Sequence, residues 1–575
     1  FTDKNEYYRE YQKKTKRFLK DDNLGLRYAR ESYNEKLKQA LSEICVTVSK
    51  DKRIELYVPE NETDSIVEQY LNALQVEYEE ISNYCNDKDM KPLDHAKKII
   101  DEMSHMIENI EFCVIMTGNE RDAYTLFEVL NDRALTVDDL ELIKNLFFKQ
   151  YCTKSQDSES HIDDNIEKLD ELWGDEIFTH DMGNGKTKLI SYLGTIYLTA
   201  DENVYTNKEE RYREIIEKSY LEKEYVSQGK PYSYINVLND IKSYQMLKVL
   251  IDEFDIPFRN SRVVALAAEC NTRKSITYKT LHLLNALGLN GVIPAITNMI
   301  LKEYVCKHTS PAEPEIHIDA FRKYVKDLGD DWQHKKDEFS QIHKWSFIIW
   351  KTTLLAKDHN LPRSLAKEIL SKVYNRSNRI GEVTIQAEFE KKLQDEFIQW
   401  TSEWQYGKQV TDFKMKVLFI NLFAYDKVGN KLNINSAVHA FTTSKLELDH
   451  MEAKNPDINA IEKYFEPKDP NDNREKYINS LGNFMILDRD DNNDKNNKPL
   501  VDAIIYYDNM AKNHWLLCEV KELLENPNYY KTVNINGEEH KVPVESFFSE
   551  RRSRLQKYFL AILKKDLNDT EIEIH

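Results

Sequence analysis

The chain has 575 residues, of which 41% are hydrophobic and 31% are charged, and its formal net charge is −19. This composition excludes an intrinsically disordered protein, and the length predicts about two to four domains. No apolar run approaches the roughly 20 residues of a membrane span. The acidic net charge counts against DNA binding, but only weakly, because a local basic groove can lie on an acidic body.

The first predicted module spans residues 1–152 and is mostly helical, with one or few strands. Residues 110–117 form its best strand candidate, and helices are predicted at 122–131 and 136–148. Thr136 and Asp139 form a capping-box pattern at the start of the second helix, where Leu140, Ile143 and Phe147 share one apolar face. The chain begins with Phe1 rather than Met, which indicates a fragment or a renumbered chain.

A helical middle domain is predicted at 166–410, after a polar break at 153–165 that we interpret as a domain boundary. One of its helices is expected to stop near Gly288, and the next to start beside Pro294. Residues 183–188, GNGKTK, resemble a phosphate loop, but that motif requires glycine where the chain has His180. We therefore predict a turn before a helix there.

The pattern changes in the third predicted domain, 411–575. Residues 412–426 are strongly apolar and are compatible with either a helix or a strand. Residues 444–453 alternate as a strand does, residues 480–489 form a second strand candidate, and residues 494–510 form a helix candidate. The predicted fold class is therefore mainly α and multidomain, with a C-terminal α+β domain of two strands and a helix. Low glycine and proline content favours the long helices.

Polar residues at the ends of these elements are those that phosphodiester hydrolysis requires. Such a reaction needs a base that titrates near neutral pH and a cation that neutralises the phosphate. Asp449 and His450 end the first strand, where alternation places their side chains on opposite faces. Asn492, Lys495 and Asn496 share a predicted helix face. Taken singly, an Asp-His dipeptide is more often a pair of surface residues without a function, and a run of Asn, Asp and Lys is more often a solvated loop.

The stretches LELDHM, SLGNFMIL and NNDK resemble the HNH, or ββα-metal, nuclease motif. More specifically, they are similar to the C-terminal nuclease domain of GmrSD-type modification-dependent (type IV) restriction enzymes. The resemblance implies that His450 is the general base and that Asp449 and Asn492 bind Mg²⁺ or Mn²⁺. It also implies that Asn483 braces the loop holding the histidine and that Lys495 contacts phosphate or the metal-site acids. Asn493 and Asn496 are alternatives to Asn492.

Residues 127–145, FEVLNDRALTVDDLELIKN, resemble an element of the N-terminal module of the same family. The resemblance assigns Asn131 and Arg133 to a nucleotide-associated element, whereas the alternative is that they form a turn between helices. Ala134 replaces the glycine usual in that element. The family's Asp-Gly-Gln-Gln-Arg stretch, which belongs to a ParB-like NTPase, is missing from this chain. We therefore expect no productive nucleotide binding by this chain alone, and an N-terminal NTPase module upstream or on a partner.

The resemblance implies a cytoplasmic, metal-dependent endonuclease that cleaves foreign or modified double-stranded DNA in prokaryotic antiviral defence. Scattered cysteines without a CxxC pair fit a reducing cytoplasm. The basic segment 551–565 supplies candidate DNA phosphate contacts, namely Arg551, Arg552 and Arg554. Two alternatives remain: a nucleic-acid-sensing scaffold whose HNH domain is inactive, and an RNA-directed toxin nuclease.

Overall fold

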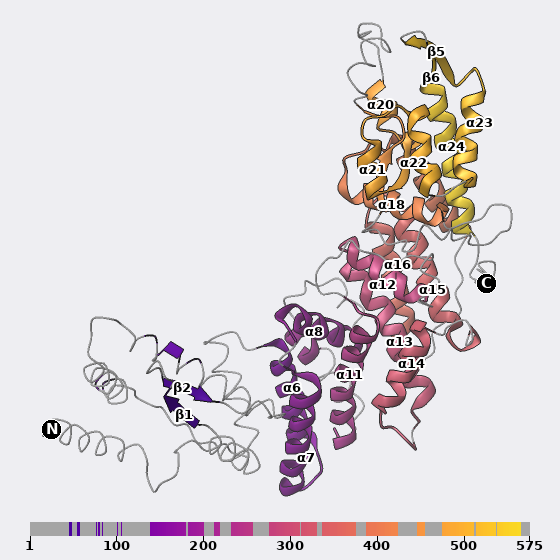
Figure 1. The fold of residues 1–575 in the computed structure, drawn as a ribbon. Helices are drawn as coiled ribbons and strands as arrows, with labels where there is room; N and C mark the ends of the chain where they lie inside the picture. The colour runs from indigo at the N-terminus through magenta and orange to yellow at the C-terminus, as the bar shows by residue number, and fades with distance from the viewer. Residues whose placement is uncertain are drawn as a thin grey trace, which may run out of the picture. The chain divides into compact units, whose positions relative to one another are not determined.

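The computed structural model separates into two compact units, Phe1–Ala123 with Gly174–Asp181, and Tyr124–Trp173 with Met182–His575 (Figure 1). Each unit is described by itself. The structure describes these residues: 45–48, 54–57, 76, 79, 80, 83, 101, 105, 138–179, 182–199, 212–218, 232–256, 275–310, 312–330, 336–374, 387–423, 446–454, 474–510, 513–535 and 538–564.

The first unit contains an antiparallel pair of strands, β1 (Cys45–Val48) and β2 (Ile54–Tyr57). Cys45 lies opposite Tyr57 in this pair. The predicted strand 110–117, the predicted helix 122–131 and the element carrying Asn131 and Arg133 lie outside the described residues. The roles assigned to them stay predictions.

The second unit begins with helices, and in the described residues they run as follows: α6 (Asp139–Lys154), α7 (Glu159–Leu172), α8 (Asn184–Leu198), α9 (Tyr212–Ile215) and α11 (Tyr234–Glu253). The π-helical η2 (Trp173–Ile177) follows α7, and its residues from Gly174 onward belong to the first unit. The apolar face predicted for α6 is confirmed, because Leu140, Ile143 and Phe147 are fully buried. The predicted capping box is wrong. Asp138 is the N-cap, since its side chain accepts a hydrogen bond from the Leu140 N–H at 2.8 Å.

Two local interpretations in this region change. Most of the polar stretch 153–165 is helical, because only a short link separates the end of α6 from the start of α7. The stretch 183–188 is largely the first turn of α8 rather than a turn before it, with Gly183 at the N-cap. Lys186 forms an ion pair with Asp252 at 2.5 Å, so its ammonium is paired within the chain. The predicted domain limits stay predictions.

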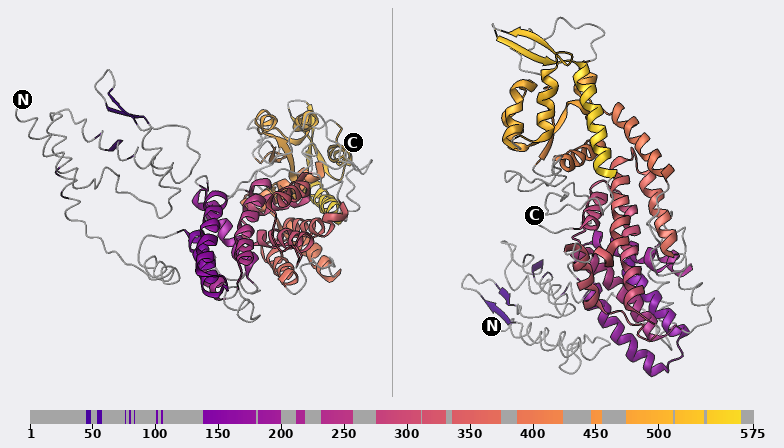
Figure 2. Two further views of the ribbon diagram at one scale, coloured as in Figure 1. Left: turned by 90° about the horizontal axis from the view of Figure 1, so that it is seen from below. Right: turned by 90° about the vertical axis from the view of Figure 1, so that its right-hand side faces the viewer.

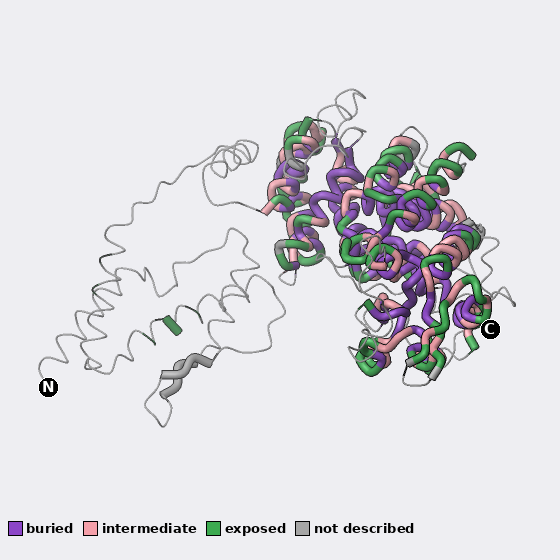
Figure 3. The backbone as a smooth tube through the Cα atoms, turned by 90° about the horizontal axis from the view of Figure 1, so that it is seen from above, coloured by how far each residue is buried: buried purple, intermediate pink, exposed green. Residues whose placement is uncertain are grey.

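The middle of the unit is helical in every described segment: α12 (Ile276–Ala286), the 3₁₀ turn η7 (Asn290–Val292), α13 (Ile293–His308), α14 (Ile318–Asp330), α15 (Lys336–Leu355), α16 (Asn360–Tyr374) and α17 (Ala387–Glu403). The predicted break is confirmed. Gly288 has a φ of 68° just beyond α12, and Pro294 lies in the first turn of α13. Buried residues concentrate where these helices pack against one another (Figure 3).

The remaining described elements are α18 (Gln409–Phe423), β3 (Leu446–His450), α20 (Arg474–Ile478), the 3₁₀ turn η9 (Leu481–Asn483), β4 (Phe484–Asp488), α21 (Arg489–Lys495), α22 (Leu500–Met510), α23 (Trp515–Glu525), β5 (Tyr530–Ile535), β6 (Glu538–Pro543) and α24 (Glu545–Lys564). The two predicted strands are confirmed as the antiparallel pair β3–β4, and two helices follow them. The ambiguous stretch at 412–426 is helical through Phe423.

The last described helix, α24, contacts several of the other elements between α17 and the end of the described residues. It is the long yellow helix in Figure 2, and it packs against α17, α18, α20 and the η9 turn. The described structure is therefore mainly α, as predicted, and its HNH-type domain stays a prediction. None of the described helices has the length and apolar character needed to cross a membrane.

Candidate active site

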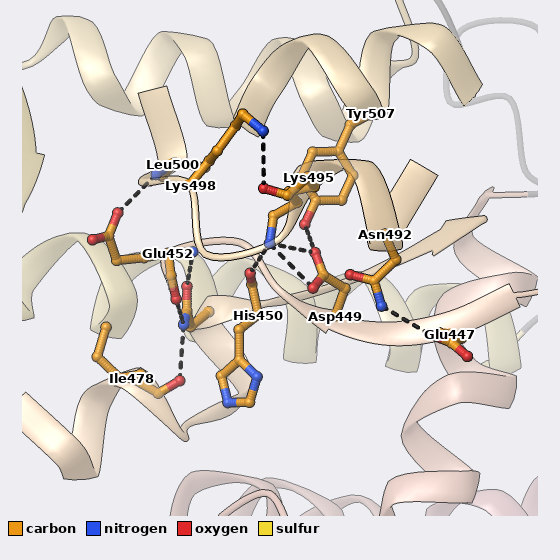
Figure 4. Close-up of polar contacts among 11 residues, drawn as sticks. Glu447, Asp449, His450, Glu452, Ile478, Asn492, Lys495, Lys498, Leu500 and Tyr507 are labelled. Atoms are coloured by element: carbon orange, nitrogen blue, oxygen red, sulfur yellow. Dashed lines mark hydrogen bonds and ion pairs between the residues drawn. The ribbon is translucent and has the colours of Figure 1, made fainter. Parts of the chain in front are cut away.

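The β3–β4 hairpin positions the predicted site. Asp449 pairs with Met485 and His450 pairs with Phe484, so both lie at the end of β3 where β4 begins. Successive strand residues point to opposite faces. Accordingly, the His450 imidazole points away from Asp449, whose carboxylate lies beside Lys495 and Tyr507 (Figure 4). The structure brings the two residues to one strand end, but not into mutual contact.

His450 lies in an aromatic and amide environment. Its Nε2 is 3.1 Å from the Asn479 Oδ1, and its ring centroid is 4.2 Å from that of Phe484 and 5.0 Å from that of Tyr406. An amide oxygen can only accept, so Nε2 carries the proton and the Nδ1 lone pair is left for another donor. Burial lowers the pKa of His450 to about 4, so the imidazole is neutral at pH 7.

Asn483 holds the chain just after His450. Its side-chain oxygen accepts from the Glu452 N–H at 2.8 Å, and its amide nitrogen donates to the carbonyls of Glu452 and Ile478, both at 2.9 Å. Its own carbonyl accepts from the Met451 N–H at 2.8 Å. Asn483 is 1% exposed, so these bonds form without competition from water. The segment that leaves His450 is thereby fixed to the start of β4.

Helix α24 in turn holds the turn that carries Asn483. A Cβ added to Gly482 would lie 1.9 Å from the Phe548 carbonyl oxygen, so glycine is required for this close approach. Arg551 donates to the carbonyls of Gly482 at 2.6 Å and Phe484 at 2.8 Å. It is 3% exposed, and burial lowers its pKa to about 10.

The prediction that Arg551 contacts DNA phosphates is therefore wrong, because its guanidinium is buried against main-chain carbonyls. Arg552 donates to the Ser402 carbonyl at 3.2 Å. Arg554 pairs with Glu550 at 2.9 Å and lies 3.9 Å from both Glu519 and Glu522. The phosphate contacts assigned to Arg552 and Arg554 stay predictions, although carboxylates already surround Arg554.

A buried polar cluster occupies the other face of β3. The Lys495 ammonium is 3.2 Å from Asp449 Oδ1 and 3.1 Å from Oδ2, and it donates to the His450 carbonyl at 2.8 Å. The Tyr507 hydroxyl donates to Asp449 Oδ2. Burial raises the pKa of Asp449 despite the neighbouring ammonium. The side chain of Lys495 is 2% exposed, so its ammonium is shielded from solvent.

This arrangement does not fit a divalent cation between Asp449 and Asn492. Both Asp449 oxygens are bonded, and a metal there would lie against the buried Lys495 ammonium. Asn492 instead donates to Glu447 at 2.8 Å. Among the described residues, no group of three or more His, Cys, Asp or Glu side chains could hold a metal ion.

The alternatives to Asn492 are also placed. Asn496 is the C-cap of α21 and has a φ of 50°, so it has left the helix. The expectation that it shares a helix face with Asn492 and Lys495 is therefore wrong. Asn493 is exposed on α21.

Three residues of this region were missed by sequence reasoning. Glu452 is 4% exposed and accepts from the Leu500 N–H at 2.8 Å, which ties the β3 end to α22, and burial raises its pKa. Asn479 binds His450, and Tyr406 contacts it from the loop before α18. Asn479 lies directly before the quoted stretch SLGNFMIL, so its position beside the motif was the available signal. Tyr406 had no signal, because its contact is tertiary.

Comparison with known proteins does not assign this chain to a family. No protein-family model matches the chain, and no curated protein matches it either.

Proposed function

We propose that this chain hydrolyses phosphodiester bonds of DNA, with His450 as the general base. The observation that carries the proposal is the state of His450: a neutral imidazole at a strand end, with Nε2 bound by Asn479 and Nδ1 left to accept a proton. Proton abstraction from water requires the neutral form of histidine, although a pKa of about 4 makes His450 a weaker base than the near-neutral histidine expected from the sequence. Three separated sequence segments converge to hold it.

The proposed division of roles follows from the contacts. Asn479 fixes the tautomer and orientation of the imidazole, because its oxygen binds the protonated ring nitrogen. Asn483 fixes the main chain after His450 through Glu452. No step is assigned to Mg²⁺ or Mn²⁺, because Lys495 is bonded to Asp449, the carboxylate that was expected to bind the metal. Foreign or modified DNA is proposed as the substrate from the motif resemblance alone.

Plasmid nicking by the purified full chain tests the proposal. Cleavage is to be measured with Mg²⁺, with Mn²⁺ and with a chelator, so that metal dependence is read separately from activity. His450→Ala is expected to lower the rate by about 10²- to 10⁴-fold, the usual contribution of a general base. The exposed His161 on α7 provides the control, since His161→Ala should cleave as wild type does. Equal rates for His450→Ala and wild type would reject the assignment.

A second function is favoured by the Asp449–Lys495 pair. An HNH-like module whose metal-site carboxylate is neutralised by a buried lysine would bind nucleic acid without cleaving it. The same plasmid assay, read together with a gel-shift measurement, separates the two. DNA binding without nicking under any metal condition would favour the binding module over the nuclease.

A further inference from the structure

Tyr406 is an exposed aromatic residue beside the candidate base. It lies in the loop between α17 and α18 and is 44% exposed, whereas most large apolar residues of this region are buried. Its ring stacks on that of Phe484, with centroids 5.1 Å apart and planes at 25°. It meets the His450 ring edge-on, at 5.0 Å and 77°. Phe484 thus covers one face of Tyr406, and no other ring of the described residues stacks on it, since Trp404 also meets it edge-on, at 6.5 Å and 78°.

The loop holds this ring in place by several contacts. The Tyr406 N–H donates to the Asn479 carbonyl at 3.0 Å, and Asn479 is also the residue that binds His450. Gly407 has a φ of 109°, which favours glycine, and its N–H donates to Asp412 at 3.0 Å. Gln405 donates to the Lys476 carbonyl at 3.0 Å. The ring and the imidazole are therefore positioned by one shared residue.

We infer that Tyr406 is a stacking platform for a nucleobase of the DNA strand whose phosphate lies at His450. This inference rests on the proposed function and specifies its substrate. An exposed aromatic face accepts any base, because every base has a π-face. Lys454, four residues after His450, and Lys476 are both exposed and supply cations for the adjoining phosphates. Glu475, 3.9 Å from Lys454, offsets part of that charge.

The substrate that follows is a strand with an unstacked base. A base inside a duplex has both faces covered by its neighbours, so it reaches Tyr406 only from a single strand or a locally opened duplex. The chain is therefore expected to prefer single-stranded or partly opened DNA to intact duplex. A purely structural role, in which Tyr406 only covers Phe484, gives no such preference.

Leucine at position 406 separates the two roles. Tyr406→Leu keeps an apolar cover over Phe484 but removes the aromatic face, whereas Tyr406→Phe keeps the face and removes the hydroxyl. Tyr506 on α22, whose ring lies 5.1 Å from the Lys498 ammonium, provides a matched control. Binding of a fluorescent 20-nucleotide oligothymidylate to the full chain is to be measured by anisotropy in a chelator, beside the same strand in duplex form.

Tyr406→Leu is expected to weaken single-strand binding by about tenfold, within the range for one base–aromatic stack. Tyr406→Phe and Tyr506→Leu should bind as wild type does, with unchanged thermal midpoints, and duplex binding should change little in all variants. Wild-type affinity in Tyr406→Leu, or an equal loss for duplex and single strand, would overturn the inference. The binding measurement needs no cleavage, so it is independent of the nicking assay. If the wild-type chain fails to nick DNA, the proposed reaction is rejected, and the effect of Tyr406→Leu on binding still tests the stacking role.

Discussion

Replacing Arg551 by methionine is expected to loosen the turn that carries Asn483. Methionine keeps most of the buried stem and removes the guanidinium, so the Gly482 and Phe484 carbonyls lose their 2.6 Å and 2.8 Å donors. Each buried acceptor left unsatisfied costs about 1–3 kcal/mol. Within the described residues the Arg551 Nη2 makes no hydrogen bond, so its removal relieves a cost. The net expectation is a loss of about 2–4 kcal/mol in local stability.

Amide hydrogen exchange in peptides covering β4 measures this loss directly. When opening is fast compared with exchange, a loss of about 2–4 kcal/mol accelerates exchange by about 30- to 1,000-fold. Arg554→Met is the matched control, since its solvent-facing pairs contribute less than about 1 kcal/mol. The slope of DNA affinity against salt should stay unchanged in Arg551→Met, because a buried guanidinium releases no counterion. Equal exchange rates in the two variants, or a lowered salt slope for Arg551→Met, would refute the reasoning.

Three further predictions concern single sites. Gly482→Ala should prevent a stable fold, because its Cβ would lie 1.9 Å from a main-chain oxygen of α24, whereas Gly183→Ala, with open space around it, should be soluble and melt as wild type does. Lys495→Met should lower the free energy of unfolding by about 3–5 kcal/mol, because it leaves the Asp449 carboxylate buried without its cation. Adding Asp449→Asn should restore much of the lost thermal midpoint. A double variant that melts no higher than Lys495→Met would contradict this pairing. Burial lowers the pKa of Lys414 to about 8, so the unfolded chain binds more protons between pH 8 and 10.5, and stability should rise with pH in that window by a few kcal/mol. The rise should be absent in Lys414→Met, as measured by denaturant midpoints.

Residue spacing and backbone preferences predicted those features of the fold that depend on neighbouring residues in the sequence. The apolar face of α6 and the break marked by Gly288 and Pro294 follow from spacing and from backbone preferences, and both are confirmed. The stretch now seen as α18 was ambiguous because its residues are apolar all round. Periodicity cannot distinguish a strand from a helix buried on several sides. Choosing Thr136 over Asp138 as the cap failed because two suitable side chains stand close together.

The error at Arg551 had a signal that was not used. Arg551, Leu555 and Phe559 recur at four-residue spacing, which places the arginine on the buried stripe of α24 rather than on its charged face. Its charge suggested exposure, and its helical position indicated burial. By contrast, the contacts of Asn479 and Tyr406 with His450 join segments far apart in sequence, so spacing alone could not have predicted them.

The position of α24 along the chain has a consequence for synthesis. It follows every other described element of the region, yet it supplies the partners of Gly482 and Phe484, and Gln556 bonds to Ile398, Thr401 and Ser402, more than 150 residues earlier. While the ribosome is still making the chain, β3 and β4 can pair, but their turn lacks its anchor. A nascent chain that stalls before α24 should therefore lack the contacts that hold the Gly482–Phe484 turn beside His450.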